Sequence, residues 1–232
     1  MKKQTAVARF NPLTHKYLVR GVWCVTALLS AGCGASRTVE EQQPVPAPTI
    51  PLPTAGLAGQ RVSLFPLTLI AAEDSLHWDV LIRERRPNLT RADSVIAELF
   101  VARAPEVTWI TPRELRSTAR RAVGIATDPD QMGTSVLRAE KLDMVPDPLR
   151  TQLRQLLALS GGRFAVVPAA LIYKRRVVGR IAGQLEATAE LTMVMVDVRL
   201  GRVVWRSVAR GLGPDPWVSL TGAVKALTPG VP

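Results

Sequence analysis

Three clusters of basic side chains are the residues of this sequence best suited to bind a ligand. They are Arg83, Arg85 and Arg86; Arg116, Arg120 and Arg121; and Lys174, Arg175 and Arg176 with Arg180. Arg116 and Arg120 are four residues apart, so a helix places them on one face. The third cluster lies between two expected strands, where a loop can project it. Each cluster could bind an anionic partner, and the alternative is ordinary solvated charge.

Side chains for nucleophilic or metal chemistry are scarce in this chain. Of the two histidines, His15 lies in the basic N-terminal region, so a serine triad would have to use His77. No GxSxG or SxxK motif accompanies it, and no HExxH or CxxC spacing is present. We therefore expect no catalytic residues, no metal and no cofactor, and we interpret His77 as a loop histidine.

Residues 128–133 begin like a calcium-binding loop. The fifth position of that loop is Met132, however, and the twelfth, which should be a bidentate glutamate, is Ala139. We interpret this segment as a polar loop.

Both cysteines, Cys24 and Cys33, lie in the first 33 residues, so the rest of the chain has no disulfide framework. Residues 1–20 are basic, and residues 21–29 form an apolar segment that is too short to span a bilayer but has the length of a signal-peptide core. The next run, Leu29-Ser-Ala-Gly-Cys33, resembles the lipobox of bacterial lipoproteins, although Ser30 stands where leucine is commonest. The alternative is ordinary signal-peptidase cleavage after Ala35.

The lipobox resemblance implies that residues 1–32 are a lipoprotein signal peptide and that a lipid on Cys33 attaches the protein to a membrane. Gly34 follows the cysteine and no aspartate is present there, which by analogy favours the outer membrane, facing the periplasm. Residues 33–59 contain five prolines after the cysteine, a composition that favours an extended tether.

The net charge of +11 would fit nucleic acid, but five of these charges lie in residues 1–32, and export makes nucleic acid an unexpected partner. A basic exported domain is better suited to anionic lipid, cell-wall polymer or an acidic protein face.

Residues 60–232 are long enough for a single globular domain, and hydrophobic residues make up 47% of the chain. Helix starts are expected at Thr90–Asp93, Thr111–Glu114, Asp147-Pro148 and Asp215-Pro216, and Gly161-Gly162 should end the third helix. Strands are expected at Val62–Ile70, Val107–Ile110, Phe164–Tyr173, Gln184–Val198 and Val203–Ala209. The last two form a hairpin that turns at Leu200-Gly201, where Asp197 supports the turn.

The element order β-α-β-α-(α)-β-β-β-α predicts an α+β (mixed α/β) fold. We expect a mixed sheet of about five strands with helices packed against it.

The run Val196-Asp-Val-Arg-Leu-Gly-Arg-Val-Val-Trp205 resembles a known superfamily, in which a long strand ends in Asp, the turn carries Gly and the return strand reads Val-Val-Trp. This superfamily contains the lipoprotein activators of penicillin-binding proteins, the curli-secretion channel lipoprotein and the amino-terminal domain of the Tol-system protein TolB. The resemblance covers most of residues 60–228, and its motifs form the fold and say little about function.

These features lead to the hypothesis of a lipid-anchored envelope module that binds or regulates another envelope protein, in cell-wall synthesis or in envelope assembly and secretion. Two alternatives remain: an oligomeric secretion-channel component and a cell-wall-acting enzyme. The sequence does not identify the partner or the oligomeric state.

A Cys33→Ser variant tests the anchor. We expect the parent protein in the membrane fraction with an acylated N-terminal cysteine, and the variant in the soluble fraction, because only the parent carries acyl chains. Fractionation and the mass of the N-terminal peptide measure this. A soluble parent with an unmodified N-terminus near Ser36 would contradict the anchor.

Overall fold

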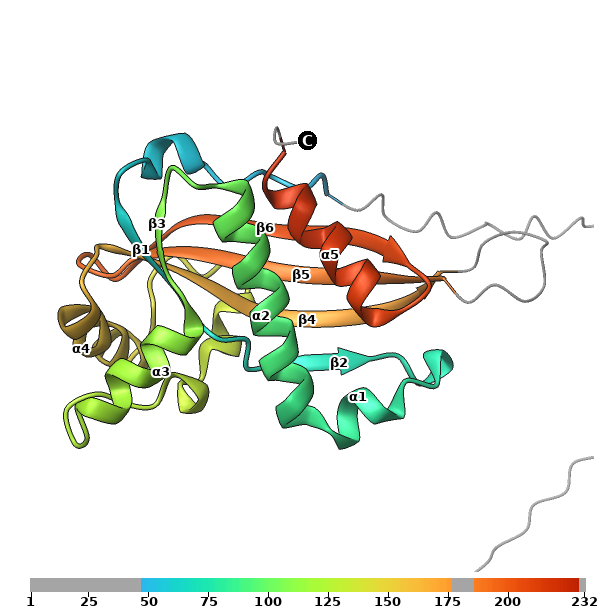
Figure 1. Ribbon diagram of the computed structural model, residues 1–232, viewed down its shortest axis with the longest axis horizontal. Coiled ribbons are helices and arrows are strands. Elements are labelled where there is room, and N and C mark those ends of the chain that lie inside the picture. Colours follow the sequence, from blue (N-terminus) through green and yellow to red (C-terminus); the bar gives the residue numbers. More distant parts are fainter. Residues whose placement is uncertain (1–46, 177–185, 230–232) are drawn as a thin grey trace, which may run out of the picture. The chain divides into compact units, whose positions relative to one another are not determined.

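The computed structural model describes residues 47–176 and 186–229 of the chain. Their centre is a six-stranded mixed sheet with the order β3-β1-β4-β5-β6, in which β2 also pairs with β4 (Figure 1). The strands are β1 (Arg61–Leu64), β2 (Ile70–Ala72), β3 (Thr108–Ile110), β4 (Phe164–Arg176), β5 (Glu186–Asp197) and β6 (Arg202–Gly213). β1 is parallel to β3 and β4, β2 is parallel to β4, and β5 is antiparallel to both of its neighbours, β4 and β6.

Helices cover both faces of the sheet, which confirms the predicted fold class. They are α1 (Asp79–Arg83), α2 (Arg85–Arg103), α3 (Pro112–Arg121), α4 (Leu149–Ser160) and α5 (Pro216–Leu227). One core packs α2 and α5 against the sheet, and a second core packs α3 and α4 on the opposite face (Figure 1). None of the helices in the described ranges has the length and apolar character that a membrane span needs.

The segment Val62–Ile70 is two strands and not one, so the predicted count of about five strands becomes six. β1 ends at Leu64 and β2 begins at Ile70, and both pair with β4. Pro66 lies in the gap and has no N–H to offer to a ladder. The register of β4 against β5 also shifts between Pro168 and Ala170. Prolines on two neighbouring segments therefore interrupt the sheet.

Three of the four predicted helix starts are confirmed. Thr111 and Glu114 form a reciprocal capping box at the start of α3, and Asp215 accepts hydrogen bonds from the first N–H groups of α5. α4 begins directly after Asp147-Pro148, and Gly161 with φ of 84° follows its last residue. The predicted hairpin of β5 and β6 is also present, with Asp197 accepting a hydrogen bond from the N–H of Leu200 at 3.1 Å.

The capping box predicted at Thr90–Asp93 is wrong, because α2 begins at Arg85 and Thr90 lies inside the helix. The Thr90 hydroxyl donates to the carbonyl of Arg86, and Asp93 is 3% exposed. Thr90 and Asp93 therefore have the spacing of a capping box but lie in the middle of α2. Asp93 instead accepts a hydrogen bond from the N–H of Leu67.

Residues 47–59, here called the N-terminal strap, pack on the domain, so the boundary predicted at residue 60 lies too far along the chain. Leu52 and Leu57 are buried, and the Leu52 N–H donates to the Leu227 carbonyl at 2.8 Å. The Trp205 indole N–H donates to the Pro51 carbonyl at 3.0 Å. Residues 33–46, the rest of the predicted tether, and Cys33 lie outside the described residues.

Gly211 marks the closest approach of β6 to α5. A Cβ at this position would lie 2.1 Å from the Ser219 carbonyl oxygen and 2.1 Å from the Ala223 nitrogen. Gly211→Ala should therefore lower the free energy of unfolding by about 3 kcal/mol, the upper range for overpacking, since backbone must move. Urea denaturation measures the change. Gly56→Ala is the matched control, because no atom lies within 4 Å of its added Cβ. Equal stability of the two variants would contradict the close packing.

Candidate protein-docking face

At one end of the sheet, where β1, β4 and β6 begin, arginines that are far apart in the sequence lie close together. Arg61 begins β1, Arg163 directly precedes β4, and Arg202 begins β6. β1 and β4 run parallel, with Val62 opposite Phe164, and the last residue of β5 pairs with the first residues of both β4 and β6. The strand register alone therefore places these three arginines at the same end of the sheet.

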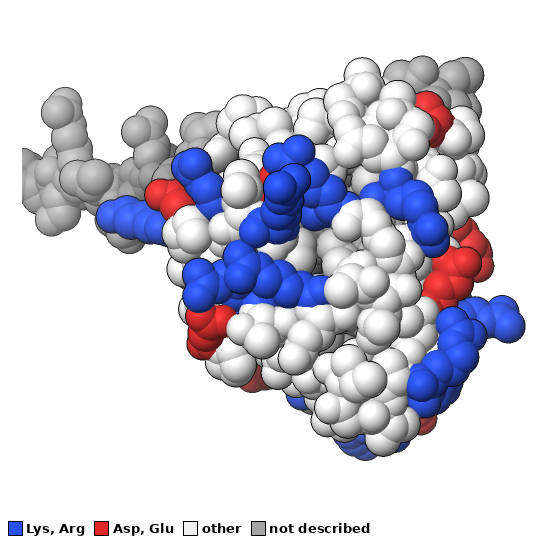
Figure 2. Space-filling model, turned by 90° about the vertical axis from the view of Figure 1, so that its left-hand side faces the viewer, with Lys and Arg blue, Asp and Glu red and all other residues white. Residues whose placement is uncertain are grey.

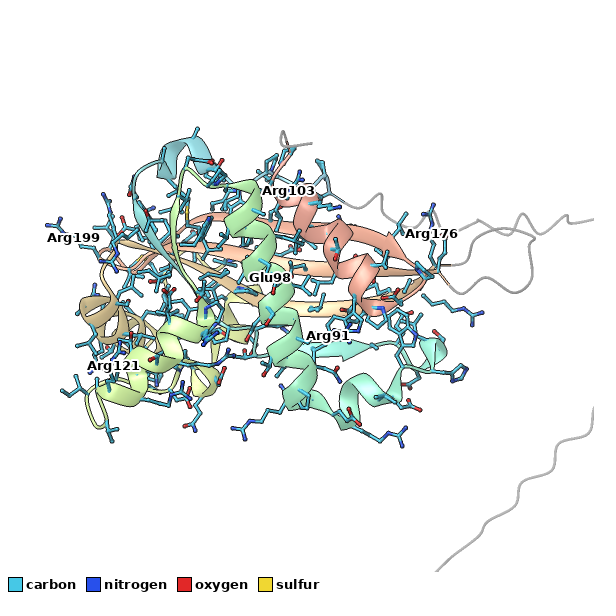
Figure 3. All side chains as sticks on the ribbon, in the orientation of Figure 1. Arg91, Glu98, Arg103, Arg121, Arg176 and Arg199 are labelled. Atoms are coloured by element: carbon cyan, nitrogen blue, oxygen red, sulfur yellow. The ribbon has the colours of Figure 1, made fainter. Side chains whose placement is uncertain are left out.

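Helix α4 and the β5–β6 turn extend this basic surface. The Arg154 guanidinium donates to the carbonyls of Val198 at 3.2 Å and Arg199 at 3.0 Å, so it holds the turn against the helix. A groove of about 270 Å³ lies here, with Leu157 and Val198 in its lining beside arginines. Arg199 projects at this end of the molecule (Figure 3).

We call the exposed side chains of Arg61, Arg154, Arg163, Arg199 and Arg202 the arginine face. Figure 2 views this end of the molecule and shows basic side chains gathered around a hollow. Within the described ranges, ion pairs involve only one of the five, Arg163, whose Nε lies 2.8 Å from Asp197 Oδ2. The arginine face therefore carries a net positive charge.

Asp197 anchors the centre of this surface. Burial opposes its ionisation, but the Arg163 guanidinium and the N–H groups of Leu200 and Arg199 outweigh burial and hold its pKa below the usual range. Asp197 thus stays ionised and fixes both Arg163 and the hairpin turn. This confirms the structural role predicted for it.

Apolar side chains accompany the arginines. Leu200, next to Arg199 in the turn, is 51% exposed, and Met144, which bridges to Arg202, is 45% exposed. Arginine and methionine are enriched in protein–protein interfaces, where apolar contacts lie beside charged ones. This composition suits a protein partner with an acidic rim.

The third predicted basic cluster lies elsewhere. Lys174, Arg175 and Arg176 are the last residues of β4, not part of a loop, and Arg180 lies outside the described residues. Lys174 Nζ is 2.7 Å from Glu190 Oε2, so its charge is paired, whereas Arg175 and Arg176 are exposed. Arg176 stands at the opposite end of the sheet from Arg199 (Figure 3).

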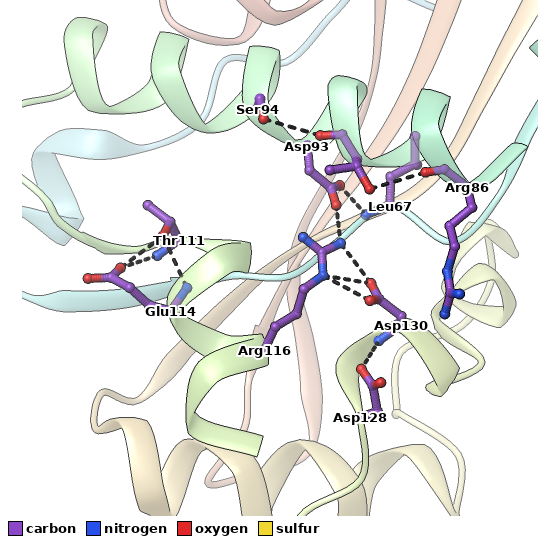
Figure 4. Close-up of polar contacts among 10 residues, drawn as sticks. Leu67, Arg86, Asp93, Ser94, Thr111, Glu114, Arg116, Asp128 and Asp130 are labelled. Atoms are coloured by element: carbon purple, nitrogen blue, oxygen red, sulfur yellow. Dashed lines mark hydrogen bonds and ion pairs between the residues drawn. The ribbon is translucent and has the colours of Figure 1, made fainter. Parts of the chain in front are cut away.

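In the second predicted cluster, Arg116 takes part in an internal network of hydrogen bonds and ion pairs (Figure 4). Arg116 donates from Nε to Asp130 at 2.8 Å and from a terminal nitrogen to Asp93 and Asp130. Asp93 also accepts the Leu67 N–H at 2.7 Å. Asp128 and Asp130, the start of the apparent calcium loop, therefore belong to this network and its adjoining turn, where Asp128 accepts the Asp130 N–H. The described residues contain no group of three potential metal ligands.

The other predicted residues have local roles. Arg85 of the first cluster donates to the Thr68 carbonyl at 2.6 Å. His77 is an exposed residue that follows a short 3₁₀ helix, Asp74–Leu76, with φ of 52°.

Sequence reasoning missed the arginine face because its members are never adjacent in the chain. The available signal was position: a single arginine stands before or at the start of several predicted strands, and two flank the predicted turn. Only the register of the sheet brings them together.

The fold and this surface define a mixed-sheet domain with a basic face at one end of the sheet. No family model matches the sequence, and no curated protein sequence matches it. Among solved structures, LpoB from Escherichia coli is 11% identical, with coverage of 89% of this chain and 90% of that chain and a TM-score of 0.37. A PelC dodecamer from Paraburkholderia phytofirmans is 12% identical, with coverage of 78% and 92% and a TM-score of 0.37. Lipoprotein GNA1162 from Neisseria meningitidis is 12% identical, with coverage of 65% and 78% and a TM-score of 0.27.

Lipoproteins of the kind that the sequence resemblance suggested are thus among the structural neighbours. These similarities are remote, at 11% and 12% sequence identity.

The Asp93 network should make stability depend on pH. Burial raises the pKa of Asp93 from 3.8 to about 6, although the Leu67 N–H and Arg116 favour the ionised form. Because the pKa is higher in the folded state, this group stabilises the fold fully below pH 4 and loses that contribution as the pH rises through 6. The loss is about 3 kcal/mol at 1.36 kcal/mol per pKa unit.

Asp93→Asn removes this titration while it keeps an acceptor for Leu67. Urea unfolding at pH 4 and pH 7 should show the free energy of the parent falling relative to that of the variant. Glu98→Gln, an exposed acid on the same helix (Figure 3), is the control and should follow the parent. Parallel behaviour of the parent and Asp93→Asn would refute the prediction.

Proposed function

We propose that this protein is a lipid-anchored module of the bacterial cell envelope that docks the acidic face of another envelope protein through the arginine face. The supporting observation is the collection of five exposed arginines at one end of the sheet, together with exposed Leu200 and Met144. Three of these arginines, Arg154, Arg163 and Arg199, line one groove. This geometry is suited to recognition between proteins. In this proposal the face positions a partner and catalyses no reaction.

The use of arginine favours an acidic protein over diffuse charge attraction. A guanidinium binds a carboxylate through two parallel hydrogen bonds and loses its hydration more easily than an ammonium group. All five charges of the face are arginines, and no lysine is among them. Arg154 and Arg163 are fixed by the hairpin carbonyls and by Asp197, so part of the surface is rigid before a partner arrives.

The proposed anchor suits this role. The lipobox-like run before Cys33 supports attachment to the membrane, and Gly34 after the cysteine supports the outer membrane, facing the periplasm. Attachment confines the search for a partner to the membrane surface, which raises the effective concentration of the two proteins. The partner in this proposal is a component of cell-wall synthesis or of envelope assembly and secretion.

Site-specific photo-crosslinking in the host tests the docking face. A photoreactive residue in place of Leu200 should crosslink to a defined envelope protein, and the triple variant Arg61→Glu, Arg199→Glu and Arg202→Glu should reduce that product by about tenfold or more, because like charges would meet the acidic partner. These three arginines are chosen because Arg154 and Arg163 hold the hairpin and their loss would disturb the fold.

The opposite end of the sheet supplies the matched control. A photoreactive residue in place of Arg175, and the reversal Arg175→Glu with Arg176→Glu, should give neither the same product nor the same loss. Thermal unfolding confirms that each variant is folded. Equal crosslinking from both ends, or a product unchanged by the triple reversal, would reject the arginine face and favour the cluster at 174–180.

A further inference from the structure

A second pocket lies at the other end of the sheet, among α1, α2 and the start of α5. Its volume is about 380 Å³, within the usual range for small-molecule sites. Two indole rings, those of Trp78 and Trp217, line it together with Glu84, Asn88 and Arg91. The proposed docking function leaves this pocket unexplained.

A neighbouring side chain holds each of the two indole rings in place. Trp78 meets Tyr173 edge to face, with ring centroids 5.3 Å apart and planes at 75°. The Arg91 guanidinium lies over Trp217, 4.3 Å from the ring centroid. Figure 3 labels Arg91 on α2. Because these side chains are already ordered, less conformational entropy is lost when a ligand binds.

The indole N–H groups separate the described tryptophans into two pairs. Trp109 donates to the Ala104 carbonyl at 3.0 Å, and Trp205 donates to the Pro51 carbonyl at 3.0 Å. Within the described ranges, the indole nitrogens of Trp78 and Trp217 have no acceptor, and neither is among the buried atoms that lack a partner. Both indole N–H groups therefore reach solvent and are available to a ligand.

The polar groups of the pocket are mixed in sign and in hydrogen-bonding role. Arg91 offers donors and Glu84 offers a carboxylate acceptor. The Asn88 side-chain amide nitrogen donates to the carbonyls of Val80 at 3.2 Å and Glu84 at 2.9 Å, which leaves the side-chain carbonyl oxygen as an acceptor. A cation would meet Arg91, which already covers Trp217, and an anion would meet Glu84. The pocket therefore favours a neutral ligand with many hydroxyl groups.

We propose that this pocket binds a pyranose ring of a polysaccharide. A pyranose combines a C–H face, which packs on the electron-rich face of an indole, with hydroxyls that both donate and accept hydrogen bonds. The two indoles supply the apolar surface, and the indole N–H groups, Arg91, Glu84 and Asn88 supply partners for the hydroxyls. In an exported protein, glycans of the cell envelope are the accessible source of such rings.

Nuclear magnetic resonance of the indole N–H groups tests the proposal directly. The full chain, isotope-labelled at tryptophan, is titrated with chitotetraose, cellotetraose and isolated peptidoglycan glycan strands, and single Trp→Phe variants assign the signals. We expect saturable shifts of the Trp78 and Trp217 signals with at least one of these glycans. The Trp109 and Trp205 signals should stay in place, because their N–H groups are already bonded within the protein.

Matched variants separate binding from folding. Trp78→Phe with Trp217→Phe keeps aromatic bulk and removes both free donors, and it should weaken binding about fivefold or more by calorimetry. Trp205→Phe, which removes a donor outside the pocket, should bind as the parent does. The outcomes that overturn the proposal are no saturable shift with any of the three glycans at millimolar concentration, and equal weakening by Trp205→Phe.

This test is independent of the arginine face. Its failure would leave the crosslinking result from Leu200 unaffected, and loss of that crosslink would leave the indole shifts unaffected.

Discussion

Between β1 and β2 the chain leaves the sheet, and the N–H of Leu67 donates its hydrogen bond to the Asp93 carboxylate instead of to a strand carbonyl. The same carboxylate pairs with Arg116, which also binds Asp130. One buried side chain of α2 thus joins the strand gap, α3 and the loop after it. Without this acceptor, the freed N–H would be buried without a partner, at a cost of about 1–3 kcal/mol. The network thus links α2 and α3, which contribute to the cores on opposite faces of the sheet.

The long strand β4 connects the two surfaces to which we assign binding roles. It begins beside Arg163 at the arginine face and, ten positions after Arg163, reaches Tyr173, which packs against Trp78 in the second pocket. At about 3.3 Å per residue, its 13 residues span about 40 Å. β4 is buried along most of its length, so it acts as a stiff spacer between the two ends. A protein partner at one end and a glycan at the other could be bound together without steric conflict.

Local chemistry was readable from the sequence wherever a signal and its partner are close in the chain. The Thr111–Glu114 box, the Asp215 cap and the Asp197 turn each satisfy neighbouring N–H groups, and all three are confirmed. The helix start predicted at Thr90–Asp93 is wrong because Asp93 accepts a hydrogen bond from the N–H of Leu67, which lies 26 positions away in the sequence. The arginine face and the paired indoles are also products of long-range register. Sequence periodicity carries no information about such register until the strands are paired.

The N-terminal strap covers β6 at the edge of the sheet and so limits pairing between molecules at high concentration. β6 is the last strand of the sheet order, and an uncovered last strand can pair with the same strand of another molecule. The strap runs beside it: Ile50 donates to the Ser207 hydroxyl, Thr49 donates to the Val208 carbonyl, and Arg210 binds the Ala47 carbonyl. Prolines at 48, 51 and 53 have no N–H with which to recruit a further strand. The N-terminal strap therefore shields this edge of the sheet against strand pairing between molecules.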